Sequence, residues 1–132
     1  MNVIITESAY QSVLAQARRD APIESCGYLL GTEAGFATEN YPMTNVDHSS
    51  EHFSFDPKEQ FAAVKYARQR GLLVVDNWHS HPASPSRPSE EDIRLAYDPN
   101  FLYFILSLAD DEPVLNAFRI VDGKVAERFP LR

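Results

Sequence analysis

The sequence predicts an α+β fold in which helices flank a central mixed β-sheet. One segment has the apolar spacing of an amphipathic helix, a second has a strong helix N-terminus, and several short apolar or alternating segments are typical of strands. The chain has 132 residues, which is the length of one domain. We therefore expect residues 1–132 to form a single domain.

The first helix is expected over residues 6–20. Its apolar residues recur at i, i+3, i+4 and i+7, namely at Tyr10, Val13, Leu14 and Ala17. Thr6 is a suitable N-cap, and Pro22 ends the helix. One face of this helix should therefore pack on the sheet.

The second helix is expected from residue 57 to about Arg70. Asp56 provides the cap, Pro57 fits the first helical position, and Glu59 can reach back to the cap. Gly71 ends the helix. A third, shorter helix is expected over residues 89–97, ended by the Asp-Pro-Asn sequence that follows.

Strands are expected at residues 26–33, 36–43, 72–78, 101–108, 114–121 and 124–129. The first two should form a hairpin around Gly35, and the apolar stretch 72–78 should be a buried central strand. Residues 44–52 have no period and are expected to be a loop that leads into an alternating segment at 53–55.

Composition and charge exclude several classes of function. Twelve Lys and Arg residues against 19 Asp and Glu residues give a net charge of −7, so a nucleic-acid partner is not expected. The single cysteine, Cys26, excludes a zinc finger and indicates a reducing compartment. No apolar run approaches the roughly 20 residues that span a bilayer. We expect a cytoplasmic protein without a membrane partner.

Potential metal ligands follow the central strand. His79 and His81 are two residues apart at its C-terminal end, so their side chains project from the same face. Asp92 follows across a proline-rich turn, at the start of the short helix. Two imidazoles and one carboxylate are the ligand set of a catalytic zinc site, in which the fourth position stays open to water. Hydrolysis by activated water is the chemistry that such a site performs.

Each of these residues also has a purely structural interpretation. Ser89 and Asp92 form an ordinary capping-box pair, which occurs at many helix N-termini without metal. A single histidine at a strand end is more often hydrogen-bonded than metal-bound. The coincidence of two same-face histidines, a stiff turn and a returning acid favours the metal site.

The segment HSHPASPSRPSEED resembles the signature of the JAMM (MPN-type) metallopeptidases. In that signature His-x-His is followed by seven residues, a serine, two residues and an aspartate, and here His79, His81, Ser89 and Asp92 match without a gap. Glu24, in ESCGYLLG, matches the upstream glutamate of the family. The resemblance covers nearly the whole chain, which has the minimal size of prokaryotic members.

The resemblance implies an MPN/JAMM-like fold with cytidine-deaminase-like architecture and one Zn²⁺ held by His79, His81 and Asp92. It implies that Glu24 is the general base for zinc-bound water and that Ser89 stabilises the oxyanion. Without the resemblance, Glu24 would be interpreted as a solvated surface residue. The implied activity is that of a peptidase or isopeptidase acting at the C-terminal Gly-Gly of a ubiquitin-like or sulfur-carrier protein.

Two other classes of function agree less well with the sequence. A non-catalytic MPN-type scaffold is the alternative, but scaffolds usually lack one or more of the ligands that this chain retains. A nucleobase deaminase would need a Cys-x-x-Cys pair, which one cysteine cannot provide. Two further residues are expected to have other roles: Ser80 should point to the opposite face of its strand, and Cys26 should be an inert buried thiol.

Overall fold

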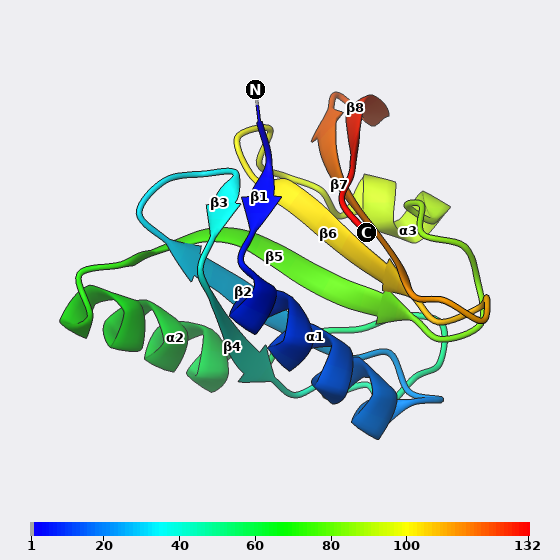
Figure 1. Cartoon of the computed structure of the whole chain (residues 1–132), viewed down its shortest axis with the longest axis horizontal. Coiled ribbons are helices and arrows are strands. Elements are labelled where there is room, and N and C mark those ends of the chain that lie inside the picture. Colours follow the sequence, from blue (N-terminus) through cyan, green and yellow to red (C-terminus); the bar gives the residue numbers. More distant parts are fainter. Residues whose placement is uncertain (1) are drawn as a thin grey trace.

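The structure is a computed structural model that describes residues 2–132. Its helices and strands are, in chain order, β1 (Ile4–Ile5), α1 (Glu7–Asp20), β2 (Cys26–Gly31), β3 (Phe36–Ala37), β4 (Glu39–Met43), α2 (Pro57–Gln69), β5 (Leu73–His81), α3 (Glu90–Arg94), β6 (Leu102–Ser107), β7 (Val114–Val121) and β8 (Lys124–Pro130) (Figure 1).

The main sheet has six strands in the order β4-β2-β5-β6-β7-β8. Strands β5 and β6 are parallel, and the other neighbours are antiparallel, so the sheet is mixed as the sequence predicts. Strand β5 lies in the interior between β2 and β6. A buried strand of this kind can hold side chains rigidly on both of its faces.

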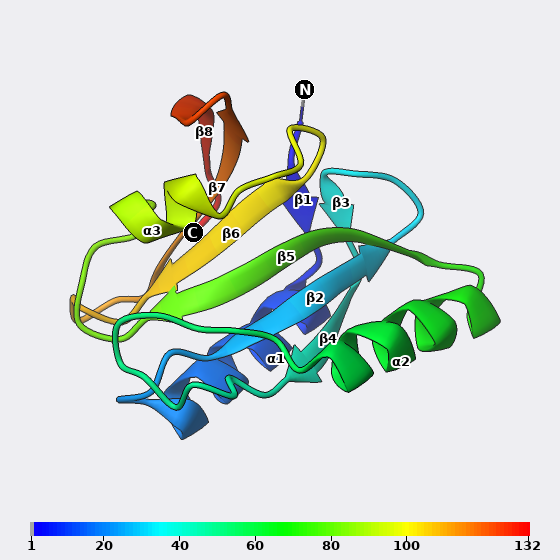
Figure 2. The same cartoon turned by 180° about the vertical axis from the view of Figure 1, so that it is seen from behind.

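Helix α1 covers one face of the sheet, whereas α2 and α3 lie on the other (Figures 1 and 2). The core beneath α1 contains Val13, Leu14, Trp78 and Phe104, which are all buried. The indole of Trp78 passes so close to Gly27 that a Cβ there would lie 2.6 Å from its Nε1. A glycine is therefore required at this position of β2.

A smaller apolar cluster lies on the other side of the sheet. Ile105, Phe118 and Ile120 are buried there, and Ile93 and Ala96 pack against them. This contact fixes the short helix α3 over β6 and β7, and it brings the N-terminus of α3 toward the end of β5. The cluster thus positions the segment that carries Asp92.

The expected elements are largely confirmed, and four differ in detail. The expected strand 36–43 is divided: β3 pairs with β1 in a separate parallel ribbon, and only β4 forms the hairpin with β2. The sequence analysis missed β1. Residues 53–55 form a single bridge, Asn45–Phe55, instead of a strand.

The other two differences concern the ends of elements around the proposed site. Strand β5 continues to His81, three residues beyond the expected end, because Ser80 and His81 still pair with β6. Helix α3 ends at Arg94 and not at Tyr97.

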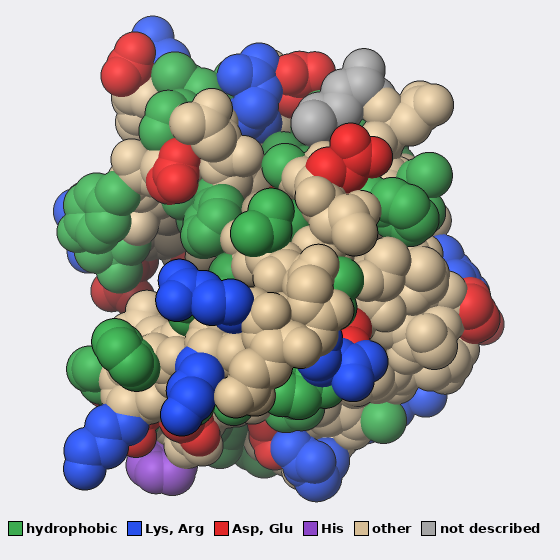
Figure 3. Space-filling model, turned by 90° about the vertical axis from the view of Figure 1, so that its left-hand side faces the viewer, with side chains coloured by type: hydrophobic (Ala, Val, Ile, Leu, Met, Phe, Trp, Pro, Cys, Tyr) green, Lys and Arg blue, Asp and Glu red, His purple; other side chains and the backbone are tan. Residues whose placement is uncertain are grey.

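The face at the α2 side of the molecule carries several basic side chains among acidic and apolar ones (Figure 3). Within residues 2–132, no helix combines the length and the apolar character needed to cross a membrane.

Candidate metal and catalytic site

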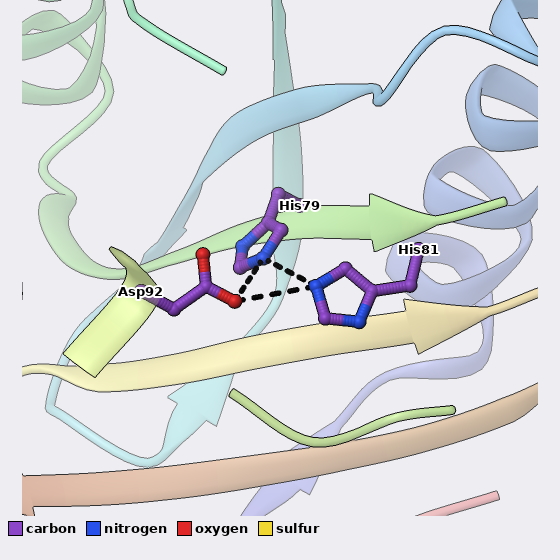
Figure 4. A group of neighbouring side chains, drawn as sticks. All are labelled: His79, His81 and Asp92. Carbon is purple, nitrogen blue, oxygen red and sulfur yellow. Dashed lines mark hydrogen bonds and ion pairs between the residues drawn. The ribbon is translucent and has the colours of Figure 1, made fainter. Parts of the chain in front are cut away.

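Strand β5 brings the two histidines to one face of the sheet. His79 and His81 are both buried, and their Nε2 atoms lie 3.2 Å apart (Figure 4). The ring of Phe53 stacks on His79 at a centroid distance of 4.7 Å. The two imidazoles are therefore held in place by the strand and by packing.

Asp92 enters the same space from the first turn of α3. Its Oδ2 lies 3.1 Å from Nε2 of His79 and 3.2 Å from Nε2 of His81 (Figure 4). The capping box of α3 holds this carboxylate, since the Ser89 backbone N–H donates to the same Oδ2 at 2.9 Å. The structure thus brings together the three residues that the sequence analysis named as potential metal ligands.

A hydrogen bond fixes the tautomer of His81. Its Nδ1 lies 2.8 Å from the carbonyl oxygen of Pro85, which can only accept, so Nδ1 carries the proton. In the neutral ring the lone pair is then on Nε2, which faces His79 and Asp92. Histidines that bind metal are commonly oriented by such an outer hydrogen bond.

The three donor atoms have the spacing that tetrahedral zinc requires. Bonds of about 2.0–2.1 Å to nitrogen and oxygen place two tetrahedral ligand atoms roughly 3.3 Å apart. The separations here are 3.1 Å between Asp92 Oδ2 and His79 Nε2, 3.2 Å between the two Nε2 atoms, and 3.2 Å between Asp92 Oδ2 and His81 Nε2. The donor set and its geometry therefore fit one zinc ion.

Burial and charge act differently on these groups. Burial raises the pKa of Asp92, but contact with the imidazoles of His79 and His81 outweighs this effect and holds the pKa well below its usual range. Burial lowers the pKa of His79 against the attraction of Asp92. An ionised carboxylate beside a neutral imidazole is the protonation state that binds a cation.

Glu24 is buried, with 3% of its surface exposed. Burial raises the pKa of its carboxyl to about 8, while His81 lowers it in part. Oε1 is buried and has no hydrogen-bond partner in the described part of the chain. Glu24 is therefore not the solvated surface residue that its own segment would suggest without the family resemblance. Glu24 lines a cavity of about 330 Å³, separate from the pocket that contains His79 and Asp92.

Two backbone contacts hold the Glu24 segment. Its N–H donates to the carbonyl of Ser49 at 2.9 Å, and its carbonyl accepts from Nδ2 of Asn45 at 3.0 Å. On its other side, the N–H of Ser25 donates to Oγ of Ser80 at 2.8 Å. Ser80 thus points away from the histidines, as expected, and ties the Glu24 segment to β5.

The sequence did not predict that loop 44–55 supports the candidate site. Asn45 holds Glu24 from this loop, and Phe53 covers His79. In the sequence, only Asn45 and the alternating pair Phe53 and Phe55 could have indicated these contacts, and they lie in a region without helical or strand periodicity. Cys26 is buried, and burial raises its pKa to about 12, which agrees with the expected inert thiol.

Comparisons with known proteins identify relatives over nearly the whole chain. The family described as "Prokaryotic homologs of the JAB domain" matches residues 6–121. The CysO-cysteine peptidase of Mycobacterium tuberculosis is 35% identical over 127 residues, which are 95% of this chain and 87% of the relative. The desampylase of Pyrococcus furiosus is 30% identical over 92 residues, covering 70% of this chain and 65% of the relative.

Solved structures agree with this assignment. A protein from Desulfitobacterium hafniense is 43% identical, with a TM-score of 0.87 over 97% of this chain and 90% of its own. A JAB1/MPN domain protein from Archaeoglobus fulgidus has the same fold, with a TM-score of 0.63, 20% identity and coverage of 96% and 94%. The chain therefore belongs to the prokaryotic JAB-domain family, and it is an enzyme of the peptidase class.

Proposed function

We propose that this chain is a zinc-dependent peptidase or isopeptidase that hydrolyses an amide bond at or after the C-terminal Gly-Gly of a ubiquitin-like or sulfur-carrier protein. In this proposal residues 1–132 are one catalytic domain that binds one zinc ion. The observation that carries the proposal is the convergence of two imidazole nitrogens and one carboxylate oxygen within 3.2 Å of one another.

His79 and His81 would hold the zinc through Nε2, and Asp92 would hold it through Oδ2. When bound, zinc lowers the pKa of a coordinated water to about 7 and polarises a carbonyl oxygen. The hydrogen bond between His81 and the Pro85 carbonyl keeps the ligand lone pair directed at the centre. The capping box does the same for Asp92.

Glu24 is proposed as the general base. Burial raises the pKa of the Glu24 carboxyl to about 8, so the metal-free group is mostly protonated at neutral pH. A bound dication would favour the ionised form, which accepts a proton and, once protonated, can donate it. Its Oε1, which has no partner among the described residues, would take a proton from the attacking water. The same oxygen would then deliver that proton to the leaving amine nitrogen.

Ser89 is proposed to stabilise the oxyanion. In the capping box its Oγ accepts the N–H of Asp92 at 3.0 Å, so the hydroxyl proton is not used there. This proton can be donated to a developing negative charge on the substrate oxygen. One well-placed donor of this kind lowers a barrier by about 3 kcal/mol.

The substrate class is supported by the names of the relatives. One relative is a CysO-cysteine peptidase, and a Thermus thermophilus relative is a probable TtuB-protein conjugate cleaving protease, 33% identical over 84 residues. Both names describe cleavage of a bond between a small named protein and an attached group. We propose that the present chain cleaves a bond of the same kind.

The decisive experiment compares the wild-type protein with Glu24→Gln. We expect about one zinc per chain in both, measured by elemental analysis. The wild-type protein should remove an extension from a Gly-Gly-tailed carrier, measured by mass spectrometry. The variant should be slower by roughly 10²- to 10⁴-fold, because it has lost proton transfer only.

Two results would contradict the proposal. Full activity of Glu24→Gln would remove this residue from the mechanism. A zinc-loaded wild-type protein that cleaves no Gly-Gly-tailed carrier would overturn the substrate class.

A further inference from the structure

A pocket of about 410 Å³ adjoins the candidate metal site and includes His79 and Asp92 in its wall. It is much wider than a glycine backbone needs. Six aromatic residues also line it: Tyr28, Phe53, Phe55, Tyr97, Phe101 and Tyr103. We call this cavity the aromatic pocket.

Three of the rings in the wall form a connected set that reaches His79. Tyr28 and Phe55 have ring centroids 5.0 Å apart, and Phe55 lies 5.3 Å from Phe53. Phe53 in turn stacks on His79. Aromatic faces that line one cavity provide a surface for apolar groups and for cations, which the π electrons attract.

The charges around the aromatic pocket are all negative. Glu91 and Asp98 lie in its wall in addition to Asp92, whose charge already faces the two histidines. Among the described residues, no lysine or arginine lines the pocket, although the chain has 12 of them. Arg94 reaches Glu91 at 3.6 Å, but Asp98 forms no ion pair within residues 2–132. One Asp98 oxygen, Oδ1, accepts the backbone N–H of Asn100 at 2.9 Å, so Oδ2 is available to a cation from outside.

Asn77 adds an unused acceptor. It lines the aromatic pocket and lies two residues before His79, on the same face of β5. Its Oδ1 is buried, and the described chain offers it no hydrogen-bond donor. An unpaired buried acceptor costs free energy, and a ligand N–H group would remove this cost only if the Asn77 amide turned toward the pocket.

We propose that the aromatic pocket binds the positively charged side chain of a substrate lysine or arginine close to the cleaved amide. The aliphatic stem would pack on the rings, and the charged end would meet Asp98. This inference rests on the proposed function and specifies its substrate. In an isopeptide the lysine at the cleaved bond is uncharged, so the side chain bound here belongs to a different residue.

The test measures binding and cleavage separately. All peptides contain Gly-Gly directly before the cleavable bond. In one series the residue just before Gly-Gly is arginine, lysine, norleucine or glutamate, and in the other series the residue just after the cleavable bond is varied in the same way. Binding to zinc-loaded Glu24→Gln is measured by calorimetry, and cleavage is measured with the wild-type protein. At one of the two positions, arginine and lysine should bind about tenfold more tightly than norleucine, and glutamate should bind least.

Substitutions of residues that line the aromatic pocket test whether this pocket causes the preference. Asp98→Asn removes a charge, and Tyr97→Leu removes a ring that is 81% exposed, so neither should disturb folding. Each should reduce the preference for arginine over norleucine to about threefold or less. Asp111→Asn, an exposed acid outside the pocket, is the matched control and should leave the preference unchanged.

Equal binding of arginine, lysine and norleucine at both positions would overturn the inference, as would equal effects of Asp98→Asn and Asp111→Asn. Failure of the proposed function has a different signature. In that case the wild-type protein would cleave none of the peptides, while the preference in binding would remain measurable.

Discussion

The two faces of strand β5 both carry buried polar groups, but the groups have different partners. On the face toward α1, Nε1 of Trp78 donates to Oδ1 of Asn40 at 2.8 Å, and Ser80 accepts the N–H of Ser25. Each donor there meets an acceptor. On the opposite face, the Nε2 atoms of His79 and His81 meet each other and a carboxylate oxygen.

The difference distinguishes structural polar groups from a binding site. Donor–acceptor pairs satisfy each other inside the protein and need no further group. Three acceptor atoms that converge within 3.2 Å repel one another unless a proton or a cation lies between them. The face of β5 that carries His79 and His81, which we call the histidine face, therefore needs a proton or a cation to complete it. On the face toward α1, the α1 face, only the Oδ2 of Asp76 has no partner within residues 2–132.

The largest expected effect tests the histidine face. His81→Ala should remove zinc binding and lower turnover by roughly 10³-fold or more, because the remaining two ligands cannot hold the ion. The metal-free fold should persist, because the apolar core beneath α1 lies on the other face. Elemental analysis, a cleavage assay and circular dichroism measure the three quantities.

The matched control is Trp78→Phe on the α1 face. It removes the hydrogen bond to Asn40 and part of a buried ring, so the free energy of unfolding should fall by about 2 kcal/mol. Zinc stoichiometry should be unchanged. Zinc loss in Trp78→Phe, or retained zinc in His81→Ala, would contradict the assignment of zinc binding to the histidine face alone.

The sequence predicted the histidine face because that face depends on local geometry. The period of two along β5 places His79 and His81 on one side, and the capping box places Asp92 at the start of α3. Each of these rules acts over a few residues. The proline-rich turn between β5 and α3 needs only to reverse the direction of the chain.

Glu24 and its support could not be predicted in this way. Glu24 is buried because Asn45 and Ser49, more than 20 residues later, bind its backbone. Such contacts leave no period in the sequence, so only the family resemblance pointed to this residue. The pairing of β1 with β3 was missed for a similar reason, since strands of two residues are too short to have a pattern.

A second prediction concerns Asp76, the exception on the α1 face. Burial raises the pKa of Asp76 from 3.8 to about 6, so the folded chain binds this proton more tightly than the unfolded chain does. Its contribution to the free energy of unfolding therefore decreases as the pH rises from about 4 to about 6, by roughly 3 kcal/mol, and is constant above that range.

Asp76→Asn isolates this contribution. Urea unfolding of both proteins between pH 4 and 7.5 gives the difference in stability, in which the shared titration of His79 and His81 cancels. The variant should gain about 3 kcal/mol relative to the wild type over this range. A difference that does not vary with pH would mean that Asp76 is satisfied in the folded chain, and both faces would then be equally complete.

The smallest expected effect concerns Ser80, which lies between the two histidines but on the α1 face. Ser80→Ala leaves the buried N–H of Ser25 without its acceptor, so the free energy of unfolding should fall by about 1–2 kcal/mol. Zinc stoichiometry should not change, and turnover should fall less than tenfold, because the segment that holds Glu24 loses one of its ties. Trp78→Phe, with a similar loss of stability, should leave turnover unchanged. If Ser80→Ala instead releases zinc, the side chain serves the histidine face, and sequence neighbours on opposite faces of β5 do not act independently.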